Sequence, residues 1–514
     1  METNMNRQDL LTSLEYHSPT VLIIGGGING VGTFRDLTLQ GVDTLLIDRA
    51  DFCSGASAAS SRMAHGGIRY LENGEFRLVR EAVRERNRMI QNAPSLVQPL
   101  PTTIPIFKTF SGLLNAPLKF LGWLEKPSER GGLVIKIGLI FYDAFTGKTR
   151  AVPHHVFDGR LKALKKYPRL NPGICYAATY YDGIILSPER LTLELLLDAE
   201  KEGDHARSLN YVSLVNVNGD KVTLRDELTG KTYDIAPRLI INAAGPWIDG
   251  TNRILGLPTQ YVGPTKGSHL VLDNPELREA IGDHEFFFEN KDGRIVLIFP
   301  LFDKIMIGTS DLPIEDPDSA RCTEEEVDYF IEMVARVFPG IKVSREQIVF
   351  RFSGVRPLAY TKAKNAGQIT RDHHIQEDKL GHIPIYSLVG GKWTSFRAFS
   401  EQVTDRALAF LGLPRKADTK SLSIGAGKYA TAIKTDPHYT RGEIAAMAKR
   451  EKIVHLDDLL LRRTLLGYLG QLTRPLVEEL ANALGESLSW NGLRKKAEVM
   501  RTLELLADRH GVRL

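Results

Sequence analysis

The chain has 514 residues and a formal net charge of +4, and 43% of its residues are hydrophobic. Because one hydrophobic core rarely organises so long a chain, the length predicts two or three domains. The composition is typical of a globular protein. The small charge argues against nucleic acid as a partner and allows only weak attraction to anionic small molecules or a membrane surface.

Cysteine usage and the N-terminus indicate the compartment. Cys53, Cys175 and Cys322 show no metal-like spacing, so we expect a reducing environment, no disulfide framework and no metal. The first twenty residues are polar and do not resemble a signal peptide. No apolar run reaches the ~20 residues needed to span a bilayer. We therefore expect a cytoplasmic protein whose membrane contact, if any, is peripheral.

The first predicted elements form a βαβ unit. Residues 21–24 and 44–47 are short apolar runs typical of buried strands. Between them, apolar residues recur at the intervals expected for one face of a helix. Gly25-Gly26-Gly27-Ile28-Asn29-Gly30 fits the G-x-G-x-x-G pattern, in which the three glycines allow a tight turn, approach to a pyrophosphate and close helix packing. Asp48 follows the second strand and can accept hydrogen bonds from ribose hydroxyls. We therefore interpret the unit as a dinucleotide-binding site rather than as an ordinary glycine-rich turn.

Two unusual stretches follow this unit. Residues 51–67 are rich in small hydroxyl side chains, which suit a surface against an extended ligand, and they lead into His65-Gly66-Gly67-Ile68-Arg69-Tyr70. Residues 100–124 are apolar and interrupted by proline, with Trp123 between Lys119 and Lys126. The latter stretch is either an interfacial membrane segment or a helix docked on the protein itself.

The remaining chain alternates strands and helices before becoming helical. Strands are predicted at 239–242, 295–298 and 304–307, a hairpin within 211–234, and a helix at 324–337. After residue 425 four helices are expected, at 441–452, 457–469, 474–484 and 491–507, which we interpret as a separate domain. The basic side chains of the last helix either are solvated or contact anionic lipid or a partner: Arg494, Lys495, Lys496, Arg501 and Arg509.

Several motifs in this order resemble one family of flavoproteins: Ile24-Gly25-Gly26-Gly27-Ile28-Asn29-Gly30, His65-Gly66-Gly67-Ile68-Arg69-Tyr70-Leu71-Glu72, Asn242-Ala243-Ala244-Gly245-Pro246-Trp247, Lys266-Gly267-Ser268-His269, Gly308-Thr309-Ser310-Asp311, Ser353-Gly354-Val355-Arg356-Pro357-Leu358, Ile369-Thr370-Arg371-Asp372 and Gly390-Gly391-Lys392. With them the chain resembles the FAD-dependent glycerol-3-phosphate dehydrogenases of the quinone-linked respiratory type. The second and sixth motifs are the most specific. Asp48 departs from the glutamate that is common in the family.

The resemblance implies an α/β fold with three parts. The first is a Rossmann-like FAD-binding domain of the D-amino-acid-oxidase/glutathione-reductase type, expected at residues 18–90, 155–255 and 350–412. The second is a β-rich substrate cap domain at residues 91–154 and 256–349. The third is the C-terminal helical domain, residues 425–514.

FAD is the cofactor that the resemblance implies. It is expected to lie against Gly25, Gly27, Gly30, Asp48, Ser57, Ser60, Ser61, His65, Gly66, Ala244, Gly245, Gly390, Gly391, Lys392 and Thr394. The expected substrate ligands are Arg69, Tyr70, Arg356, Arg371 and Lys392, since arginine forks and lysine charges suit a phosphate. His65 or His269 would act as the base, with Arg356 or Lys392 stabilising negative charge on the reacting oxygen.

The implied reaction is oxidation of sn-glycerol 3-phosphate to dihydroxyacetone phosphate by hydride transfer to FAD, followed by electron transfer to a membrane quinone. Peripheral membrane contact is expected through residues 110–124 or the basic last helix, and a homo-oligomer is one further option. Three alternatives remain open. They are an oxidase that uses O2, an amine or amino-acid oxidase on the same fold, and a non-catalytic flavin-binding sensor or scaffold.

Overall fold

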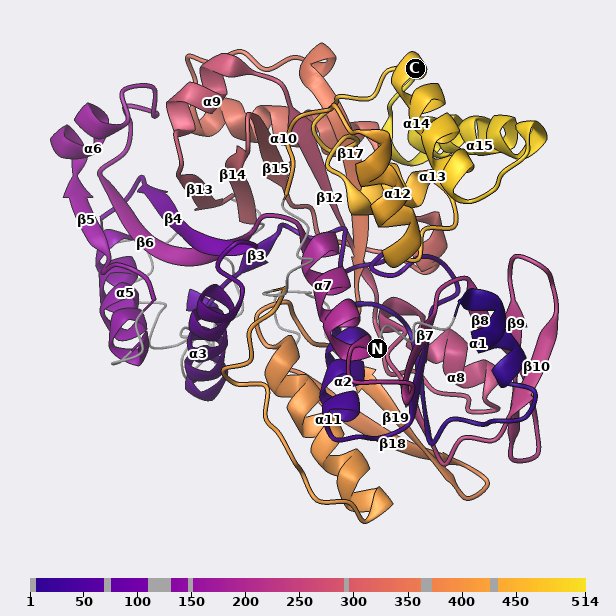
Figure 1. The fold of residues 1–514 in the computed structure, drawn as a ribbon. Helices are drawn as coiled ribbons and strands as arrows, with labels where there is room; N and C mark the ends of the chain where they lie inside the picture. Colours follow the sequence, from indigo (N-terminus) through magenta and orange to yellow (C-terminus); the bar gives the residue numbers. More distant parts are fainter. Residues whose placement is uncertain are drawn as a thin grey trace.

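Two main β-sheets, a small three-stranded sheet and a C-terminal group of helices make up the architecture of the described residues (Figure 1). This computed structural model describes residues 6–68, 75–109, 131–146, 151–290, 295–361, 372–425 and 433–514. The short helix α1 (Arg7–Ser13) precedes the first sheet, and Asn6 caps it through a bond from the Asp9 N–H.

The first sheet is six-stranded and is built around β1 (Val21–Ile24). Its order is β18-β19-β11-β1-β2-β7, and all neighbours are parallel except β18 and β19. The other strands are β2 (Thr44–Ile47), β7 (Ala206–Leu209), β11 (Leu239–Asn242), β18 (His374–Leu380) and β19 (Ile383–Val389). β1, β2 and β11 are buried at every position, as expected for parallel strands covered on both faces.

Helices cover one face of this sheet and a small sheet covers the other. α2 (Ile28–Leu39), α7 (Pro188–Glu200) and α11 (Phe396–Leu411) share a core with Val21 and Ile23. Leu22 and Ile24, which point the opposite way, pack with a three-stranded antiparallel sheet. Its strands are β8 (Val212–Asn218), β9 (Lys221–Asp226) and β10 (Thr232–Ile235). η3 (Gly245–Trp247) and α8 (Ile248–Ile254) follow β11.

The larger sheet has the order β16-β12-β15-β14-β13-β4-β6-β3, with β17 paired to β12 and β5 to β6. Its strands are β3 (Met63–Ala64), β4 (Val97–Ile106), β5 (Val156–Gly159), β6 (Tyr176–Ile185), β12 (Thr265–Leu272), β13 (Glu285–Glu289), β14 (Ile295–Leu301), β15 (Lys304–Gly308), β16 (Leu312–Pro313) and β17 (Ile348–Arg356). Its helices are α3 (Phe76–Asn92), α5 (Gly132–Thr146), α6 (Arg160–Lys166), α9 (Pro275–Ile281), α10 (Glu324–Val337), and the 3-10 turns η4 (Pro317–Ser319) and η5 (Arg345–Gln347).

The C-terminal helices pack directly on the larger sheet. They are α12 (Arg441–Arg450), α13 (Leu456–Asp458), the π-helical turn η7 (Leu459–Arg463), α14 (Arg474–Ser487) and α15 (Gly492–His510). Leu270 of β12 faces α10, whereas its neighbour Val271 joins a core with Leu460 and Leu484 of the C-terminal helices. The two faces of one sheet therefore hold different parts of the chain, as the alternation of side chains along a strand requires.

The expected fold class is confirmed, and the domain boundaries stay a prediction. The larger sheet takes strands from both expected domains, since β3, β5, β6 and most of β17 fall within the ranges expected for the FAD-binding domain. The reason is long-range pairing, since β6 runs beside β4 along its whole length and β17 beside β12. A strand's own residues do not specify such partners.

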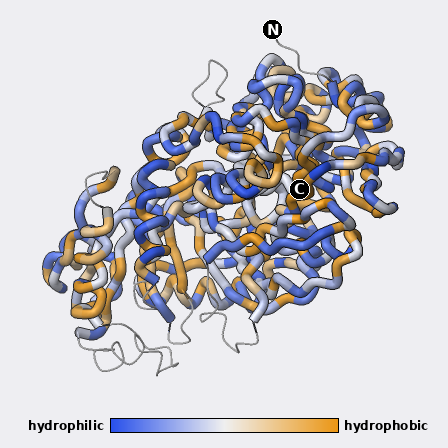
Figure 2. The backbone as a smooth tube through the Cα atoms, turned by 90° about the horizontal axis from the view of Figure 1, so that it is seen from below, coloured by the Kyte–Doolittle hydropathy of each residue, from blue (hydrophilic) through white to orange (hydrophobic). Residues whose placement is uncertain are grey.

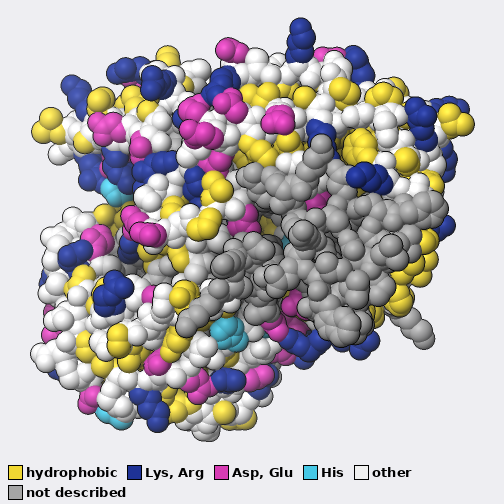
Figure 3. Space-filling model, turned by 180° about the vertical axis from the view of Figure 1, so that it is seen from behind, with side chains coloured by type: hydrophobic (Ala, Val, Ile, Leu, Met, Phe, Trp, Pro, Cys, Tyr) yellow, Lys and Arg dark blue, Asp and Glu magenta, His cyan; other side chains and the backbone are white. Residues whose placement is uncertain are grey.

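The surface of the described residues is mixed in character. On the face in Figure 3, Lys and Arg side chains are interspersed with Asp and Glu, in keeping with the small net charge. The hydrophilic α3 lies beside the mainly hydrophobic α5 (Figure 2). Within the described residues, no helix has the length and apolar character needed to cross a membrane.

Candidate active site

A cavity of about 1680 Å³ lies where the two sheets and the C-terminal helices meet. Its walls include the glycine turn after β1, the serine-rich loop at 54–61, the end of β17 and part of α15. The volume exceeds the ~300–1,000 Å³ typical of a pocket for one small ligand. The cavity therefore has room for an extended cofactor and a substrate together.

The glycine turn can be made only by glycine. Gly25 has φ +112°, and a Cβ there would lie 2.6 Å from the Ala243 carbonyl oxygen. A Cβ on Gly30 would lie 1.9 Å from the Gly25 carbonyl oxygen. These contacts let α2 begin against the strand, so that residues 27–29 at its N-terminus line the cavity. A helix N-terminus in this position suits a pyrophosphate.

Asp48 is fixed at the end of β2 beside this turn. Its carboxylate accepts the Gly26 N–H at 2.7 Å and the Ala50 N–H at 2.9 Å. Burial raises the pKa of Asp48 to about 6, so the side chain is ionised at neutral pH. The carboxylate lines the cavity as an acceptor, which is what a ribose hydroxyl requires.

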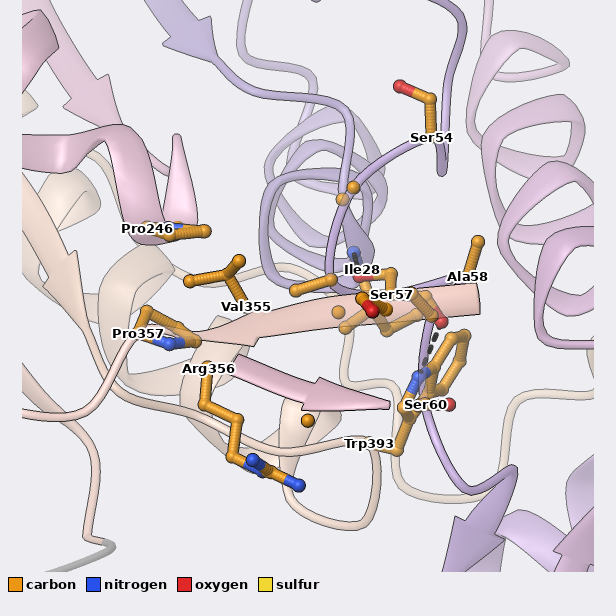
Figure 4. Close-up of a pocket in the computed structure, with 18 of the residues that line it drawn as sticks. Ile28, Ser54, Ser57, Ala58, Ser60, Pro246, Val355, Arg356, Pro357 and Trp393 are labelled. Atoms are coloured by element: carbon orange, nitrogen blue, oxygen red, sulfur yellow. Dashed lines mark hydrogen bonds between the residues drawn. The ribbon is translucent and has the colours of Figure 1, made fainter. Parts of the chain in front are cut away.

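The serine-rich loop is held by contacts with three other elements. Ser57 Oγ accepts the Ile28 N–H at 2.9 Å and therefore caps α2, while the Ser57 carbonyl accepts from Trp393 Nε1 at 3.0 Å (Figure 4). Ser60 Oγ accepts the Arg62 N–H. Ser61 Oγ lies 2.8 Å from His269 Nε2. All three serines line the cavity, and their hydroxyls also order the loop itself.

Arg356 extends from the end of β17 into the cavity (Figure 4). Its guanidinium donates to Thr309 Oγ1 at 2.8 Å and to the Ser310 carbonyl at 3.1 Å, and it lies 3.3 Å from Asp311 Oδ1. A Cβ on Gly267 would lie 2.3 Å from the guanidinium, so this glycine leaves the space that the Arg356 head group occupies. The side chain stays 27% exposed. This is a cation of fixed position with surface left for an anion.

His269 is buried on β12 and stacks on Phe352, with ring centroids 4.9 Å apart. Burial, with the positive charges of Arg356 and Arg62, lowers the pKa of His269 to about 3, so the ring is neutral. Its Nδ1 has no hydrogen-bond partner among the described residues. Nε2 is engaged by Ser61, so the ring is held in one orientation.

A second glycine turn carries Lys392 to the cavity. Gly390 and Gly391 have φ of +78° and +91°, and a Cβ on Gly391 would lie 2.4 Å from the Asn29 side chain. Thr394 Oγ1 donates to the His65 carbonyl at 3.0 Å. The turns that hold His65 and Lys392 are thereby tied together at the same wall.

Most of the predicted site residues meet in this cavity. Those that line it are Gly25, Gly27, Asp48, Ser57, Ser60, Ser61, His65, Ala244, Gly245, His269, Arg356, Gly390, Gly391, Lys392 and Thr394. Gly30 and Gly66 do not line it. Gly30 packs on Gly25, and the Gly66 N–H donates to Asp182 Oδ1 and Tyr142 Oη rather than toward a ligand. Arg69, Tyr70 and Arg371 lie outside the described residues.

Sequence reasoning missed three lining residues that fit a cofactor. Asn29 Oδ1 and Trp247 Nε1 are buried without a hydrogen-bond partner among the described residues, and both side chains line the cavity. Trp393 orders the serine-rich loop through Ser57. Asn29 occupies a variable position of the glycine pattern and Trp247 ends the Asn242–Trp247 motif. The motifs therefore include both residues but assign no function to either. With the glycine cradle and Asp48, these orphaned polar groups fit a dinucleotide.

The fold and site define a flavin-dependent oxidoreductase. The family model "FAD dependent oxidoreductase" matches residues 20–405. A glycerol-3-phosphate dehydrogenase of Synechocystis sp. is 36% identical over 75% of this chain and 69% of its own length. A D-erythritol 1-phosphate dehydrogenase of Brucella abortus is 32% identical over 74% of this chain and 72% of its own.

A solved structure has the same fold throughout. The glycerol-3-phosphate dehydrogenase from Bacillus halodurans, complexed with FAD, superposes with a TM-score of 0.72 at 21% identity and covers 98% of this chain and 97% of its own. On the sequence matches, the chain belongs to the FAD-dependent glycerol-3-phosphate dehydrogenase family, and its cofactor is FAD.

Proposed function

We propose that the protein oxidises glycerol 3-phosphate to dihydroxyacetone phosphate and passes the electrons to a membrane quinone. Bound FAD supplies the hydride acceptor and the redox chemistry. The observation that carries the proposal is Arg356, a guanidinium fixed by Thr309, Ser310 and Asp311 at the wall of the cavity that fits FAD. The name of the Synechocystis relative supports the choice of substrate.

Arg356 would bind the phosphate of the substrate. Because its position is already fixed by the protein, little side-chain entropy is lost when a phosphate binds, and a planar fork matches two phosphate oxygens. Lys392 lines the same cavity and adds a second positive charge. Arg69, Tyr70 and Arg371 remain predicted ligands from the family motifs. Fixed cations of this kind favour a phosphorylated alcohol over an amino acid, which has a single carboxylate.

The proton of the C2 hydroxyl would go to a histidine. His269 is a poor base in the ligand-free protein because its pKa is about 3 and Ser61 engages Nε2. His65 is half-buried and lines the cavity from a turn held by Thr394. We therefore assign proton removal to His65 and orientation of the substrate or the flavin to His269.

Anaerobic bleaching of the flavin absorbance tests the substrate. We expect glycerol 3-phosphate to bleach the purified holoenzyme, with unphosphorylated glycerol as the matched control that lacks only the phosphate. D-Erythritol 1-phosphate is the natural competitor, given the name of the Brucella relative. A higher kcat/KM for the erythritol phosphate would move the assignment to the longer polyol. Bleaching by an amino acid alone would overturn it.

Stopped-flow reoxidation separates the two electron acceptors. The reduced enzyme is mixed with either a soluble short-chain quinone or air-saturated buffer. We expect the quinone to reoxidise the flavin much faster than O2 does. Rapid turnover with O2 and none with the quinone would instead identify an oxidase.

Peripheral membrane association is part of the proposal, and α5 supports it. Leu133, Ile137, Ile140 and Phe141 are all more than 40% exposed on this helix, with Ile140 at 53%. Residues 110–124, the predicted interfacial segment, lie outside the described residues and shortly precede α5. Part of the expected basic face of α15 is already occupied, since Arg501 pairs with Asp457.

Vesicle flotation tests this surface. We expect an Ile137→Asn, Ile140→Asn and Phe141→Asn variant to lose binding to vesicles of mixed zwitterionic and anionic lipid. Leu161→Asn is the control, because Leu161 is 89% exposed but lies on α6, outside both candidate membrane segments. Unchanged flotation of the α5 variant, and of a variant lacking residues 113–124, would remove both segments from the membrane contact.

A further inference from the structure

The C-terminal helices form part of the wall of the cofactor cavity. Leu461 and Arg462 of η7 line it together with Arg501, Leu505 and Arg509 of α15. The oxidoreductase family model ends at residue 405, so none of these residues belongs to the matched segment. A domain that we interpreted from sequence as separate thus contributes side chains to the site.

One buried carboxylate connects this domain to residues 48–61, here called the cofactor loop, which run from Asp48 through the serine-rich loop. Asp51 is fully buried, and Arg463 donates to both of its oxygens, at 2.7 and 2.9 Å. Arg462 Nε adds a third bond at 2.6 Å. Burial alone would raise the pKa of Asp51, but the two guanidinium groups lower it to about 2. The carboxylate of Asp51 is therefore ionised although it is buried, and Arg462 and Arg463 of the C-terminal domain balance its charge.

Asp51 stands between the two halves of the predicted cofactor contact. It lies three residues after Asp48 and three residues before the serine-rich loop, and Asp48 and Asp51 both line the cavity. The Cys53 N–H donates to the Gly26 carbonyl, which joins this stretch to the glycine turn. A shift of Asp51 would move both the ribose acceptor and the loop that caps α2.

A second set of contacts holds the same stretch from the opposite side. Asn210 Nδ2 donates to Asp51 Oδ1 and to the Lys452 carbonyl. Tyr211 donates its N–H to the Ala50 carbonyl and its hydroxyl to Asp458. The stretch from Asp48 to Asp51 is thus clamped between the β7–β8 junction and residues 452–463.

We propose that the C-terminal helical domain is a structural part of the FAD site, which it completes by holding Asp51 through Arg462 and Arg463. These arginines are positioning residues, since they act on the cofactor loop through Asp51. Holding the loop and binding FAD are then linked. FAD must bind more weakly when the domain is loosened, and FAD binding must in turn protect the domain from opening by the same factor.

Arg463→Met tests the clamp, because methionine keeps much of the side-chain volume and removes both bonds to Asp51. Arg190→Met is the matched control. Arg190 makes an equally buried two-bond pair with Glu451, at 2.9 and 2.9 Å, at the same domain interface, and its guanidinium donates to Glu451 and the Arg463 carbonyl rather than to Asp51. Titration of each apoprotein with FAD, followed by flavin fluorescence, gives the Kd. We expect Arg463→Met to raise the Kd at least about tenfold and Arg190→Met to raise it less than threefold.

Hydrogen exchange of the wild-type protein provides the second measurement, so the proposal stays testable if a variant does not fold. We expect amides of residues 456–463 to exchange several-fold faster in the apoprotein than with FAD bound, while those of α10, on the far face of the larger sheet, do not change. Equal loss of FAD affinity in both variants, unchanged affinity in Arg463→Met, or no FAD-dependent protection of residues 456–463 would each overturn the proposal.

Discussion

Replacing Arg356 by alanine is the most direct perturbation of the proposed substrate site. The guanidinium is held by Thr309, Ser310 and Asp311, so its place in the cavity is fixed before any ligand arrives. Hydrogen bonds to charged groups contribute about 1.5–3 kcal/mol each. Loss of a two-bond fork to phosphate would then cost about 3–6 kcal/mol, or roughly a 10²- to 10⁴-fold loss in kcat/KM.

The carboxylate of Asp311 adds to this effect. Arg356→Ala leaves the Asp311 charge near the site of the phosphate, and repulsion between two charges about 4 Å apart in water is ~1 kcal/mol. An Arg356→Ala, Asp311→Asn double variant should therefore recover about fivefold over the single variant. Arg356→Lys keeps the charge without the fork, so we expect kcat/KM between those of the wild type and the alanine variant.

The assay is anaerobic reduction of the flavin by glycerol 3-phosphate, with bound FAD measured by its absorbance. Arg351→Ala is the matched control, since Arg351 lies on the same strand but pairs with Glu324 outside the cavity. We expect its kcat/KM to stay within about threefold of wild type. A comparably small loss in Arg356→Ala with FAD retained would refute the role of Arg356, and loss of FAD would place Arg356 with the cofactor instead.

Three further predictions concern the cofactor cradle and the buried histidine. Gly30→Ala should abolish FAD binding because its Cβ would overlap the Gly25 carbonyl, whereas Gly340→Ala, which has open space around the new Cβ, should bind FAD normally in the same fluorescence titration. Asp48→Asn should weaken FAD binding about tenfold and remove the fall in wild-type affinity expected below pH 6, where Asp48 becomes protonated. His269 has a pKa of about 3 in the folded state and ~6.5 in the unfolded state, so the unfolded state binds a proton first as the pH is lowered. The free energy of unfolding therefore decreases as the pH falls below 6.5, by about 2 kcal/mol between pH 8 and pH 5. Urea unfolding of His269→Gln should lack that part of the decrease, and an unchanged pH slope would contradict a buried neutral ring.

Short-range sequence patterns correctly predicted the helices and strands that depend on residues close to one another in the sequence. The βαβ unit is present with strand bounds that match residues 21–24 and 44–47. The helix at 324–337 was also predicted correctly, because Thr323 and Glu326 form a capping box before an amphipathic run. The helix expected at 457–469 is shorter, since η7 ends at Arg463. There Arg462 and Arg463 both donate to the distant Asp51, and Arg462 also donates to Asp457 and Asp458.

Long-range partners explain what the sequence did not reveal. Asp51 and Arg463 are 412 residues apart, and neither residue type indicates burial on its own. Gly66 lies within a family motif, which suggested direct contact with the cofactor, but its N–H is taken by Asp182 and Tyr142. The motif thus indicates that the turn needs a particular backbone conformation, but it does not show which atoms of the turn face the ligand.

The charges around the cavity link substrate binding to the protonation of His269. Burial and the charge of Arg356 hold the pKa of His269 far below its ordinary value, which makes the ligand-free site a poor base at this position. A phosphate dianion bound at Arg356 would offset that positive charge and raise the pKa of His269. The basicity of His269 would then increase only when a phosphorylated substrate is present, so the cation that binds the phosphate would also set the charge of the histidine that orients the substrate or the flavin.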